Sequence, residues 1–208
     1  MKILLVSATA LEIAPFVALK YDVEILITGV GAPACMYEVS KKLQTNVYDF
    51  VIQAGIAGTF KNTFPLCETF IVQQDLYADL GISENDNHFT LFDVNLADAN
   101  TSPYNNGWLV NDGIINVGLA FAKSITVNTV SDDITITELY KKKFDADIES
   151  MEGAAFHYVC IKENVPFLQI RSVSNFVGER LKTNWKIKES IDSLNKNLKA
   201  VVDILMKE

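Results

Sequence analysis

Short apolar segments that alternate with segments of helical spacing constrain the fold of this chain more than any other feature. Residues 2–7 (KILLVS) form a continuous apolar run, and similar runs return at 22–28 (DVEILIT) and 49–54 (DFVIQA). Such short, uninterrupted runs are typical of strands that are covered on both faces. Helical spacing follows the first two runs, over residues 10–20 and 34–43. This alternation predicts an α/β fold with parallel strand pairs.

The second half of the chain is expected to continue the pattern after an irregular stretch. Residues 67–119 contain alternating segments separated by Asn, Asp, Gly and Pro, which predicts further strands with long loops. Strands are then expected over 123–130 and 166–172, and helices over 138–144 and 152–161.

The last segment has apolar residues at spacings of three and four from Ile187 to Leu205, which predicts a helix with one apolar face. We find no repeat, low-complexity tract or linker, so a single domain over residues 1–208 is expected. The predicted architecture is α/β, with three α/β/α layers around a central mixed twisted sheet.

The charge balance argues against a nucleic-acid or membrane protein. Eighteen Lys and Arg residues stand against 26 Asp and Glu residues, which gives a net charge of −8, and the longest basic run is residues 141–143. An extended contact with phosphate backbones is therefore not expected. The sequence also lacks an apolar window of about eighteen residues, so no membrane span is predicted.

The cysteines and histidines are few and scattered. Cys35, Cys67 and Cys160 form no CxxC pair, and the chain opens without a signal-type segment, which favours a reducing cytoplasm. His88 and His157 have no metal-ligand spacing, so we expect neither a metal nor another cofactor. His157 and Cys160 are predicted to be core residues on an apolar helix face.

The ends of the predicted strands carry the polar and glycine residues of interest, because ligands bind at the carboxyl ends of strands in such sheets. Singly, each residue is ordinary: paired glycines usually form tight turns, and a glutamate at a helix start complements the helix dipole. The residues at these exits are Glu12, Gly29, Gly31, Gly55, Gly58, Glu152 and Asn175.

Five segments stand in this order along the chain: KILLVSATALE, TGVGAPA, QAGIAGTF, ESMEGAAFHYVC and LQIRSVSN. Together they resemble the purine nucleoside phosphorylase and nucleosidase superfamily over essentially the whole chain. Within it the resemblance is strongest to futalosine hydrolases, through ESMEGAA and SNFVGERLKTNW, although Glu179 replaces that group's proline. The 5'-methylthioadenosine/S-adenosylhomocysteine nucleosidases share the skeleton but usually have Ser-Asp where this chain has Ser174-Asn175.

This resemblance implies a nucleoside phosphorylase-like fold and hydrolysis of the N-glycosidic bond of futalosine, which releases hypoxanthine and dehypoxanthine futalosine in menaquinone biosynthesis. Two alternatives remain open: a methylthioadenosine/adenosylhomocysteine nucleosidase, and a non-catalytic nucleoside-binding protein of the same fold. In each case the expected partner is a small-molecule nucleoside, and the expected assembly is a homodimer or a higher homo-oligomer.

Cleavage of a ribose–purine bond passes through an oxocarbenium-like sugar, so the site needs a carboxylate beside the ribose, a base for water and a group facing the purine. The resemblance implies that Glu12 activates water and that Met151 and Glu152 lie under the ribose, with Glu152 accepting hydrogen bonds from its hydroxyls. It likewise implies that Ser174 and Asn175 face the purine. In the structural alternatives, Glu12 and Glu152 only stabilise the first turn of a helix, and Asn175 only forms an Asx turn.

The amide of Asn175 offers one donor for O6 and one acceptor for a protonated N7, so it predicts a 6-oxopurine. Aspartate would accept two hydrogen bonds, which suits the amino group and protonated N7 of a departing 6-aminopurine.

The only arginines are Arg171 and Arg180. A phosphorylase usually holds phosphate with arginine and backbone N–H groups, so the lack of an earlier arginine favours water as the nucleophile. The resemblance implies that Arg171 organises the water and Glu12, with a salt bridge at the edge of the core as the alternative.

Arg180 and Trp185 are expected at the 5' end of the substrate, where futalosine carries an aromatic carboxylate. The alternative is a surface arginine and a tryptophan that anchors the last helix. Other candidate ligand contacts are Gly31, Ala57, Gly58, and the predicted strand residues Thr129 and Val130, which lie where related enzymes contact the purine.

Overall fold

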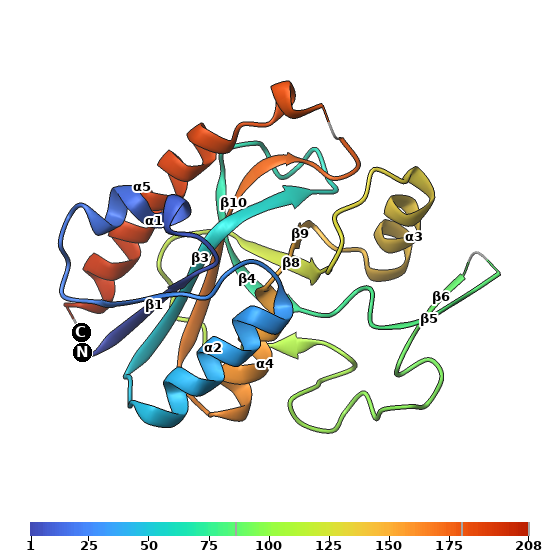
Figure 1. Cartoon of the computed structure of the whole chain (residues 1–208), viewed down its shortest axis with the longest axis horizontal. Helices are drawn as coiled ribbons and strands as arrows, with labels where there is room; N and C mark the ends of the chain where they lie inside the picture. The colour runs from blue at the N-terminus through green and yellow to red at the C-terminus, as the bar shows by residue number, and fades with distance from the viewer. Residues whose placement is uncertain (86, 180, 208) are drawn as a thin grey trace.

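A mixed β-sheet with helices on both faces forms the centre of the computed structural model, which describes residues 1–85, 87–179 and 181–207 (Figure 1). The strands of the main sheet are β1 (Ile3–Ser7), β2 (Glu24–Ile27), β3 (Phe50–Thr59), β4 (Thr69–Asp75), β7 (Leu109–Val110), β8 (Phe121–Thr126), β9 (Ile148–Ser150) and β10 (Phe167–Phe176). A separate pair consists of β5 (Gly81–Glu84) and β6 (Asn87–Thr90).

Helices cover the two faces of the sheet and a short 3₁₀ turn precedes the last helix (Figure 1). These elements are α1 (Ala10–Val17), α2 (Ala32–Thr45), α3 (Ile134–Phe144), α4 (Gly153–Lys162), η1 (Lys182–Asn184) and α5 (Ile187–Leu205). Helices α1 and α5 pack together on one face, and α2 and α4 pack together on the other. The predicted three-layer α/β/α class is therefore confirmed.

The strand order of the main sheet is β10-β4-β8-β9-β3-β1-β2, and β10 also pairs with β3. The pairing of β3 with β10 closes the strands from β10 to β3 into a ring, with β1 and β2 extending from β3. Parallel pairs, such as β1 with β3, occur beside antiparallel ones, such as β3 with β9. The predicted mixed sheet is confirmed, and its partial closure was not predicted.

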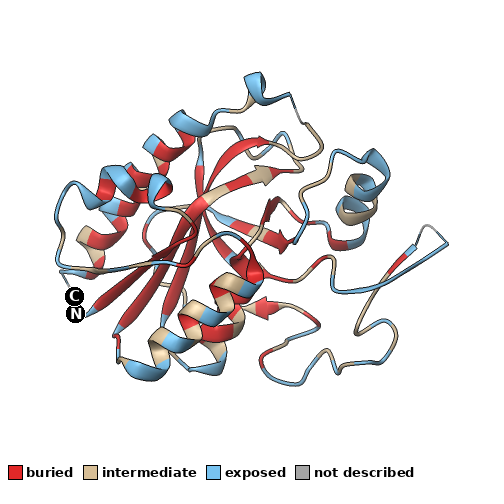
Figure 2. Cartoon of the chain, in the orientation of Figure 1, coloured by how far each residue is buried: buried red, intermediate tan, exposed pale blue. Residues whose placement is uncertain are grey.

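The apolar run at the start of the chain is explained by burial on both sides of β1. Ile3 and Leu5 belong to the core beneath α1 and α5, whereas Leu4 and Val6 belong to the core beneath α2 and α4. Figure 2 shows buried residues along most of the length of the central strands. A strand with two covered faces needs apolar residues at successive positions, which is the pattern that the sequence has.

Several predicted boundaries are wrong. Strand β8 ends at Thr126, so residues 127–130 are not part of the predicted strand 123–130. There the backbone N–H of Asn128 binds the Asp79 carboxylate, and Asp133 caps α3. Strands β3 and β10 continue past their predicted ends because each serves as the other's partner.

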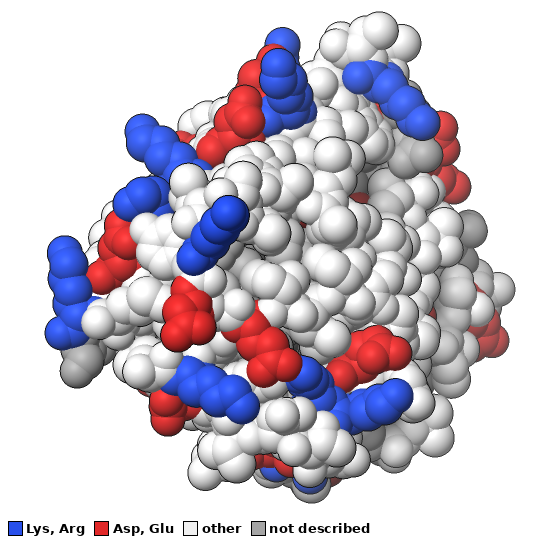
Figure 3. All heavy atoms as spheres, turned by 60° about the vertical axis from the view of Figure 1, so that its left-hand side comes forward, with Lys and Arg blue, Asp and Glu red and all other residues white. Residues whose placement is uncertain are grey.

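Charged side chains of both signs are interspersed on the face shown in Figure 3, and they form no continuous basic band there. Among the described residues, we find no helix that is long and apolar enough to span a membrane.

Candidate active site

A cavity of about 360 Å³ opens where the ends of β1, β3 and β10 meet β9. Its volume lies in the range of small-molecule sites, about 300–1,000 Å³. Nine of the residues predicted from the sequence line it: Glu12, Ala57, Gly58, Val130, Met151, Glu152, Ser174, Asn175 and Trp185. The elements that carry them are far apart in the sequence and are brought together by the β3–β10 and β3–β9 pairings.

Glu12 has both a structural role and a place in the cavity. Thr9 is the N-cap of α1, and Glu12 completes a capping box in which its Oε2 accepts from the Thr9 backbone N–H at 3.0 Å and from the Thr9 hydroxyl at 2.8 Å. Its Oε1 accepts from the backbone N–H of Ile56 on β3 at 3.1 Å. The first-turn alternative is thus compatible with the geometry, and the same hydrogen bonds fix the carboxylate at the cavity wall.

Glu152 occupies the N-cap position of α4, but its side chain makes no cap hydrogen bond to that helix. Instead, Oε1 accepts from the backbone N–H of Gly31 at 2.9 Å, and Oε2 lies 3.4 Å from Nη1 of Arg171. Gly31 has φ +99°, which favours glycine, and this conformation starts α2. Gly31 does not line the cavity, and it contacts Glu152 rather than open space.

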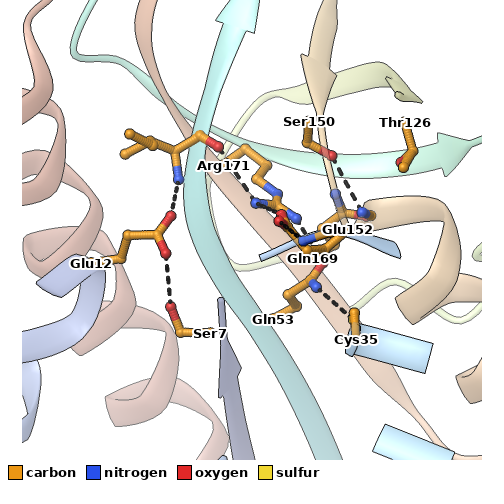
Figure 4. Close-up of polar contacts among 12 residues, drawn as sticks. Ser7, Glu12, Cys35, Gln53, Thr126, Ser150, Glu152, Gln169 and Arg171 are labelled. Atoms are coloured by element: carbon orange, nitrogen blue, oxygen red, sulfur yellow. Dashed lines mark hydrogen bonds and ion pairs between the residues drawn. The ribbon is translucent and has the colours of Figure 1, made fainter. Parts of the chain in front are cut away.

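Arg171 is 2% exposed and lies behind Glu152 (Figure 4). Its Nη2 donates to Gln53 Oε1 at 2.9 Å, and Nη1 is 3.4 Å from both Glu152 Oε2 and the carbonyl oxygen of Ile56. The ion pair of Arg171 is therefore with Glu152. The implied role of Arg171 in organising the water and Glu12 stays a prediction.

Gly55 separates Arg171 from Glu12. A Cβ at Gly55 would lie 2.4 Å from Arg171 Nη1 and 3.0 Å from Glu12 Oε1. Only a residue without a side chain leaves room for both groups at this point of β3. The guanidinium and the Glu12 carboxylate are consequently held near one backbone position without bonding to each other in the described contacts.

Asn175 and Ser174 form the opposite wall of the cavity. The Asn175 Nδ2 donates to the carbonyl of Phe176 at 3.0 Å, and its Oδ1 lies 2.8 Å from the Ser174 hydroxyl. Because a carbonyl oxygen can only accept, the first contact fixes the orientation of the amide. One N–H of Nδ2 and one acceptor position of Oδ1 remain for a ligand.

Besides Gly31, two predicted site residues in the described part of the chain, Thr129 and Arg171, do not line the cavity. Thr129 is exposed and does not line it, because β8 has already ended. Arg171 is buried behind it, as described above. Arg180 lies outside the described residues.

Trp185 does line the cavity, and its Nε1 donates to the carbonyl of Glu179 at 2.8 Å. The described residues between 76 and 108 do not contribute to the cavity wall.

The sequence reasoning missed Glu149, which lines the cavity from β9 and is 7% exposed. Burial, with a smaller contribution from the nearby Asp79 carboxylate, raises the pKa of Glu149 to about 7. The available signal was a glutamate that directly follows Ile148 and stands three residues before Glu152. The Thr9–Glu12 capping box was also overlooked, although its Ser/Thr-x-x-Glu spacing is visible in the sequence.

The cavity is acidic. Glu12, Glu149 and Glu152 line it, whereas none of its described lining residues is Lys or Arg. In the described part of the chain, we find no group of three or more His, Cys, Asp or Glu side chains that could hold a metal ion. The arrangement can therefore surround a group that develops positive charge with carboxylates.

The chain is similar in sequence and fold to several known proteins. The chain is 27% identical over 172 residues to a futalosine hydrolase from Thermus thermophilus, covering 81% of this chain and 76% of that protein. It is 23% identical over 198 residues to a 5'-methylthioadenosine/S-adenosylhomocysteine nucleosidase from Buchnera aphidicola, covering 90% and 81%. The fold is similar to the native structure of a futalosine hydrolase from Helicobacter pylori, with a TM-score of 0.80, 16% identity and 98% of both chains covered. The family profile of the phosphorylase superfamily matches residues 15–207, and the chain therefore belongs to this superfamily.

Proposed function

We propose that this protein is an N-glycosyl hydrolase that cleaves futalosine to hypoxanthine and dehypoxanthine futalosine, with water as the nucleophile. The observation that carries this proposal is the acidic cavity, in which Glu12, Glu149 and Glu152 face the ligand space without a described cation among the lining residues. Carboxylates stabilise a sugar that becomes cationic, and they oppose the binding of phosphate. The similarity to the Thermus futalosine hydrolase supports the choice of substrate.

Glu12 is proposed as the general base and Glu152 as the ribose anchor. In the reaction, the water oxygen bonds to the anomeric carbon and Glu12 takes a proton from the water. The purine leaves with the electron pair of the broken bond and takes a proton at N7 from solvent water, and Glu12 then returns its proton to solvent. Glu152 accepts hydrogen bonds from the ribose hydroxyls, and Met151 lies beneath the ring. Arg171 positions Glu152 through the ion pair at 3.4 Å.

Asn175 is proposed to recognise the base. Its remaining N–H donates to O6, and its remaining acceptor position binds the proton on N7. These contacts suit a 6-oxopurine such as hypoxanthine. Ser174 supports the amide from behind, and Ala57, Gly58 and Val130 complete the wall. Trp185 is proposed, with Arg180, to receive the 5' substituent.

A methylthioadenosine/adenosylhomocysteine nucleosidase is the second candidate, supported by the similarity to the Buchnera enzyme. Asn175 argues against it, because an amide offers an N–H where a 6-aminopurine also offers one. A binding protein without catalysis would not require Glu12 to be held at the cavity wall, so this third candidate is the least supported.

Release of free purine from futalosine, 5'-methylthioadenosine and inosine, each with and without phosphate, tests the proposal. We expect hypoxanthine from futalosine and no sugar phosphate in any reaction. Faster release of adenine from methylthioadenosine would favour the second candidate, and binding without release would favour the third. Sugar 1-phosphate products would exclude water as the sole nucleophile.

The variant Glu12→Gln tests the assignment of the base. General-base catalysis contributes about a hundred- to ten-thousand-fold, so kcat should fall on that scale. The matched control is Glu138→Gln, which makes the same change at an exposed acid on α3. Turnover near that of the unaltered protein in Glu12→Gln would remove the assignment.

A further inference from the structure

Glu152 stands at the N-cap position of α4 without capping that helix. The side chain of an N-cap residue usually accepts a hydrogen bond from the backbone N–H of the second or third helical residue. The carboxylate of Glu152 makes no such bond, and it accepts from the N–H of Gly31 at 2.9 Å instead. Gly153 and Ala154, the first residues of α4, are buried. Their backbone N–H groups therefore need acceptors from another part of the chain.

Thr126, at the end of β8, supplies the missing cap. Its hydroxyl oxygen accepts from the backbone N–H of Ala154, the second residue of α4, at 2.7 Å. On β9, Ser150 Oγ accepts from the N–H of Gly153 at 3.3 Å, which is a longer contact (Figure 4). The acceptors for the first turn of α4 thus come from two strands of the sheet, and the Glu152 carboxylate is not needed for this purpose.

Asp75 fixes the direction of the Thr126 hydroxyl. Its Oδ1 accepts from that hydroxyl at 2.9 Å, so the single hydroxyl hydrogen is used and a lone pair of the oxygen faces the N–H of Ala154. Asp75 is fully buried, and its Oδ2 accepts from Nε2 of Gln169 at 3.3 Å. A Cβ at Gly153 would lie 2.1 Å from the same Oδ2, so the first turn of α4 packs directly against the carboxylate.

Loss of the Thr126 hydroxyl would give the Glu152 carboxylate a competing partner. The N–H of Ala154 would be buried without an acceptor, which is costly. Glu152 stands two residues before Ala154, at the position from which a side-chain oxygen can accept from this N–H. A carboxylate that turned back to cap its own helix would leave the N–H of Gly31 and the proposed ribose contact.

We propose that Thr126 is a positioning residue for Glu152: it caps α4 from β8, so that the Glu152 carboxylate stays directed at Gly31 and at the ribose hydroxyls. Thr126 is fully buried and does not line the cavity, so it acts through Glu152 rather than on the substrate. Asp75 supports this role by holding the hydroxyl. The inference rests on the proposed nucleosidase function and adds to it a residue that lies outside the cavity.

The test uses the preference for a ribose 2'-hydroxyl as a measure of the position of Glu152. The probes are 9-deazainosine and 2'-deoxy-9-deazainosine, in which a carbon–carbon bond joins the base to the sugar and prevents hydrolysis. Calorimetry gives the ratio of their dissociation constants in the unaltered protein, in Glu152→Gln, in variants of Thr126, and in Thr126→Val combined with Glu152→Gln. Thermal melting verifies that each variant is folded.

Three substitutions of Thr126 separate the hydroxyl from the volume of the side chain. Valine matches threonine in size but has no hydroxyl, serine retains the hydroxyl, and cysteine replaces it with a thiol, which is a weak acceptor. The matched control is Thr45→Val, which removes an exposed threonine hydroxyl at the last residue of α2.

In the unaltered protein and in Thr45→Val, the ribonucleoside analogue should bind about ten-fold or more tightly than its deoxy form, because only the former donates a hydrogen bond from the 2'-hydroxyl to a carboxylate. Thr126→Val should reduce this preference by about five-fold or more and Thr126→Cys by about two-fold or more, whereas Thr126→Ser should change it by less than about two-fold. In the Glu152→Gln protein, Thr126→Val should have little further effect, because the interaction that it acts through has already been removed.

A purely structural role of Thr126 would lower the Tm of Thr126→Val and leave the 2'-hydroxyl preference unchanged, and this result would overturn the proposal. Absence of the preference in the unaltered protein would overturn it as well. If Thr126→Val does not fold, Thr126→Cys takes its place, and an unchanged preference in that variant leads to the same rejection.

The positioning role and the nucleosidase function fail in different ways. Cleavage of nucleosides with a 2'-hydroxyl preference that does not depend on Thr126 would reject the positioning role and leave the nucleosidase function standing. Binding of the ribonucleoside analogue that depends on both Thr126 and Glu152, without cleavage of any nucleoside, would reject the nucleosidase function and retain the positioning role.

Discussion

Replacement of Gly55 by alanine should disturb Arg171 and Glu12 together. The new Cβ would lie 2.4 Å from Arg171 Nη1 and 3.0 Å from Glu12 Oε1, whereas nonbonded carbon contacts are favourable at about 3.5–4.0 Å. The guanidinium or the β3 backbone must therefore move by about 1 Å. Arg171 is held by Gln53 and Glu152 and is 2% exposed, so it cannot move toward solvent without breaking its ion pair with Glu152.

Overpacking of a core costs about 1–3 kcal/mol. For a chain of this length, 1 kcal/mol corresponds to about 2–4 °C, so Gly55→Ala should lower Tm by roughly 2–12 °C. Purine-release kinetics should show a higher KM and a lower kcat, because movement of Arg171 displaces the proposed ribose anchor. The control is Gly113→Ala, whose Cβ would meet nothing nearer than Asn111 Oδ1 at 3.7 Å. A Gly55→Ala protein with the Tm and kcat/KM of the unaltered protein would refute this reasoning.

Three other predictions concern the ribose, the 5' end and the buried Asp75. Glu152→Gln should raise KM and lower kcat. The unaltered enzyme should cleave 2'-deoxyinosine more slowly than inosine, and equal rates for the two nucleosides would contradict a contact to the 2'-hydroxyl. Trp185→Ala should raise KM for futalosine more than for inosine, and equal increases would instead favour a tryptophan that only anchors the last helix. Burial raises the pKa of Asp75 from 3.8 to about 6, despite hydrogen bonds from Thr126 and Gln169. The folded state therefore binds the carboxyl proton of Asp75 more tightly than the unfolded state does. For this reason Asp75 lowers the free energy of unfolding as the pH rises from about 4 to above 6. In denaturant titrations between pH 4 and pH 7.5, the free energy of unfolding of Asp75→Asn should therefore fall by roughly 2 kcal/mol less than that of the unaltered protein. Parallel pH profiles would show that the pKa of Asp75 is not raised.

The layered fold could be predicted because strand burial leaves a direct trace in the sequence. β1 is apolar at successive positions since both of its faces are covered, and α5 has its apolar residues on one side since it covers only one face of the sheet. The closure of β3 onto β10 left no such trace. Residues 55–58 are rich in glycine and alone would be taken for a turn, but in the structure they are the part of β3 that pairs with β10 and β9.

The residues of the site were easier to predict from the sequence than the residues with which they form hydrogen bonds and ion pairs. Glu12, Glu152 and Asn175 stand at the ends of recognisable strands or helices, so their approximate position follows from the order of elements. The partner of Arg171 depends on which side of Gly55 the guanidinium passes, and no local pattern contains that information. Thr129 was misplaced because the apolar pattern of β8 continues for one residue beyond the strand, to the buried Val127.

The three glutamates of the cavity differ in the hydrogen bonds that the protein donates to them. Glu12 and Glu152 are held by donors from other parts of the chain, so their positions are set before a nucleoside binds. Preorganised carboxylates need no rearrangement when positive charge develops on the sugar, which is the requirement for stabilising a transition state. Glu149 has no such donor in the described structure, and its pKa of about 7 reflects burial without compensation. A hydrogen-bond donor on a bound ligand would offset the cost of its charged form, which the described protein groups leave uncompensated.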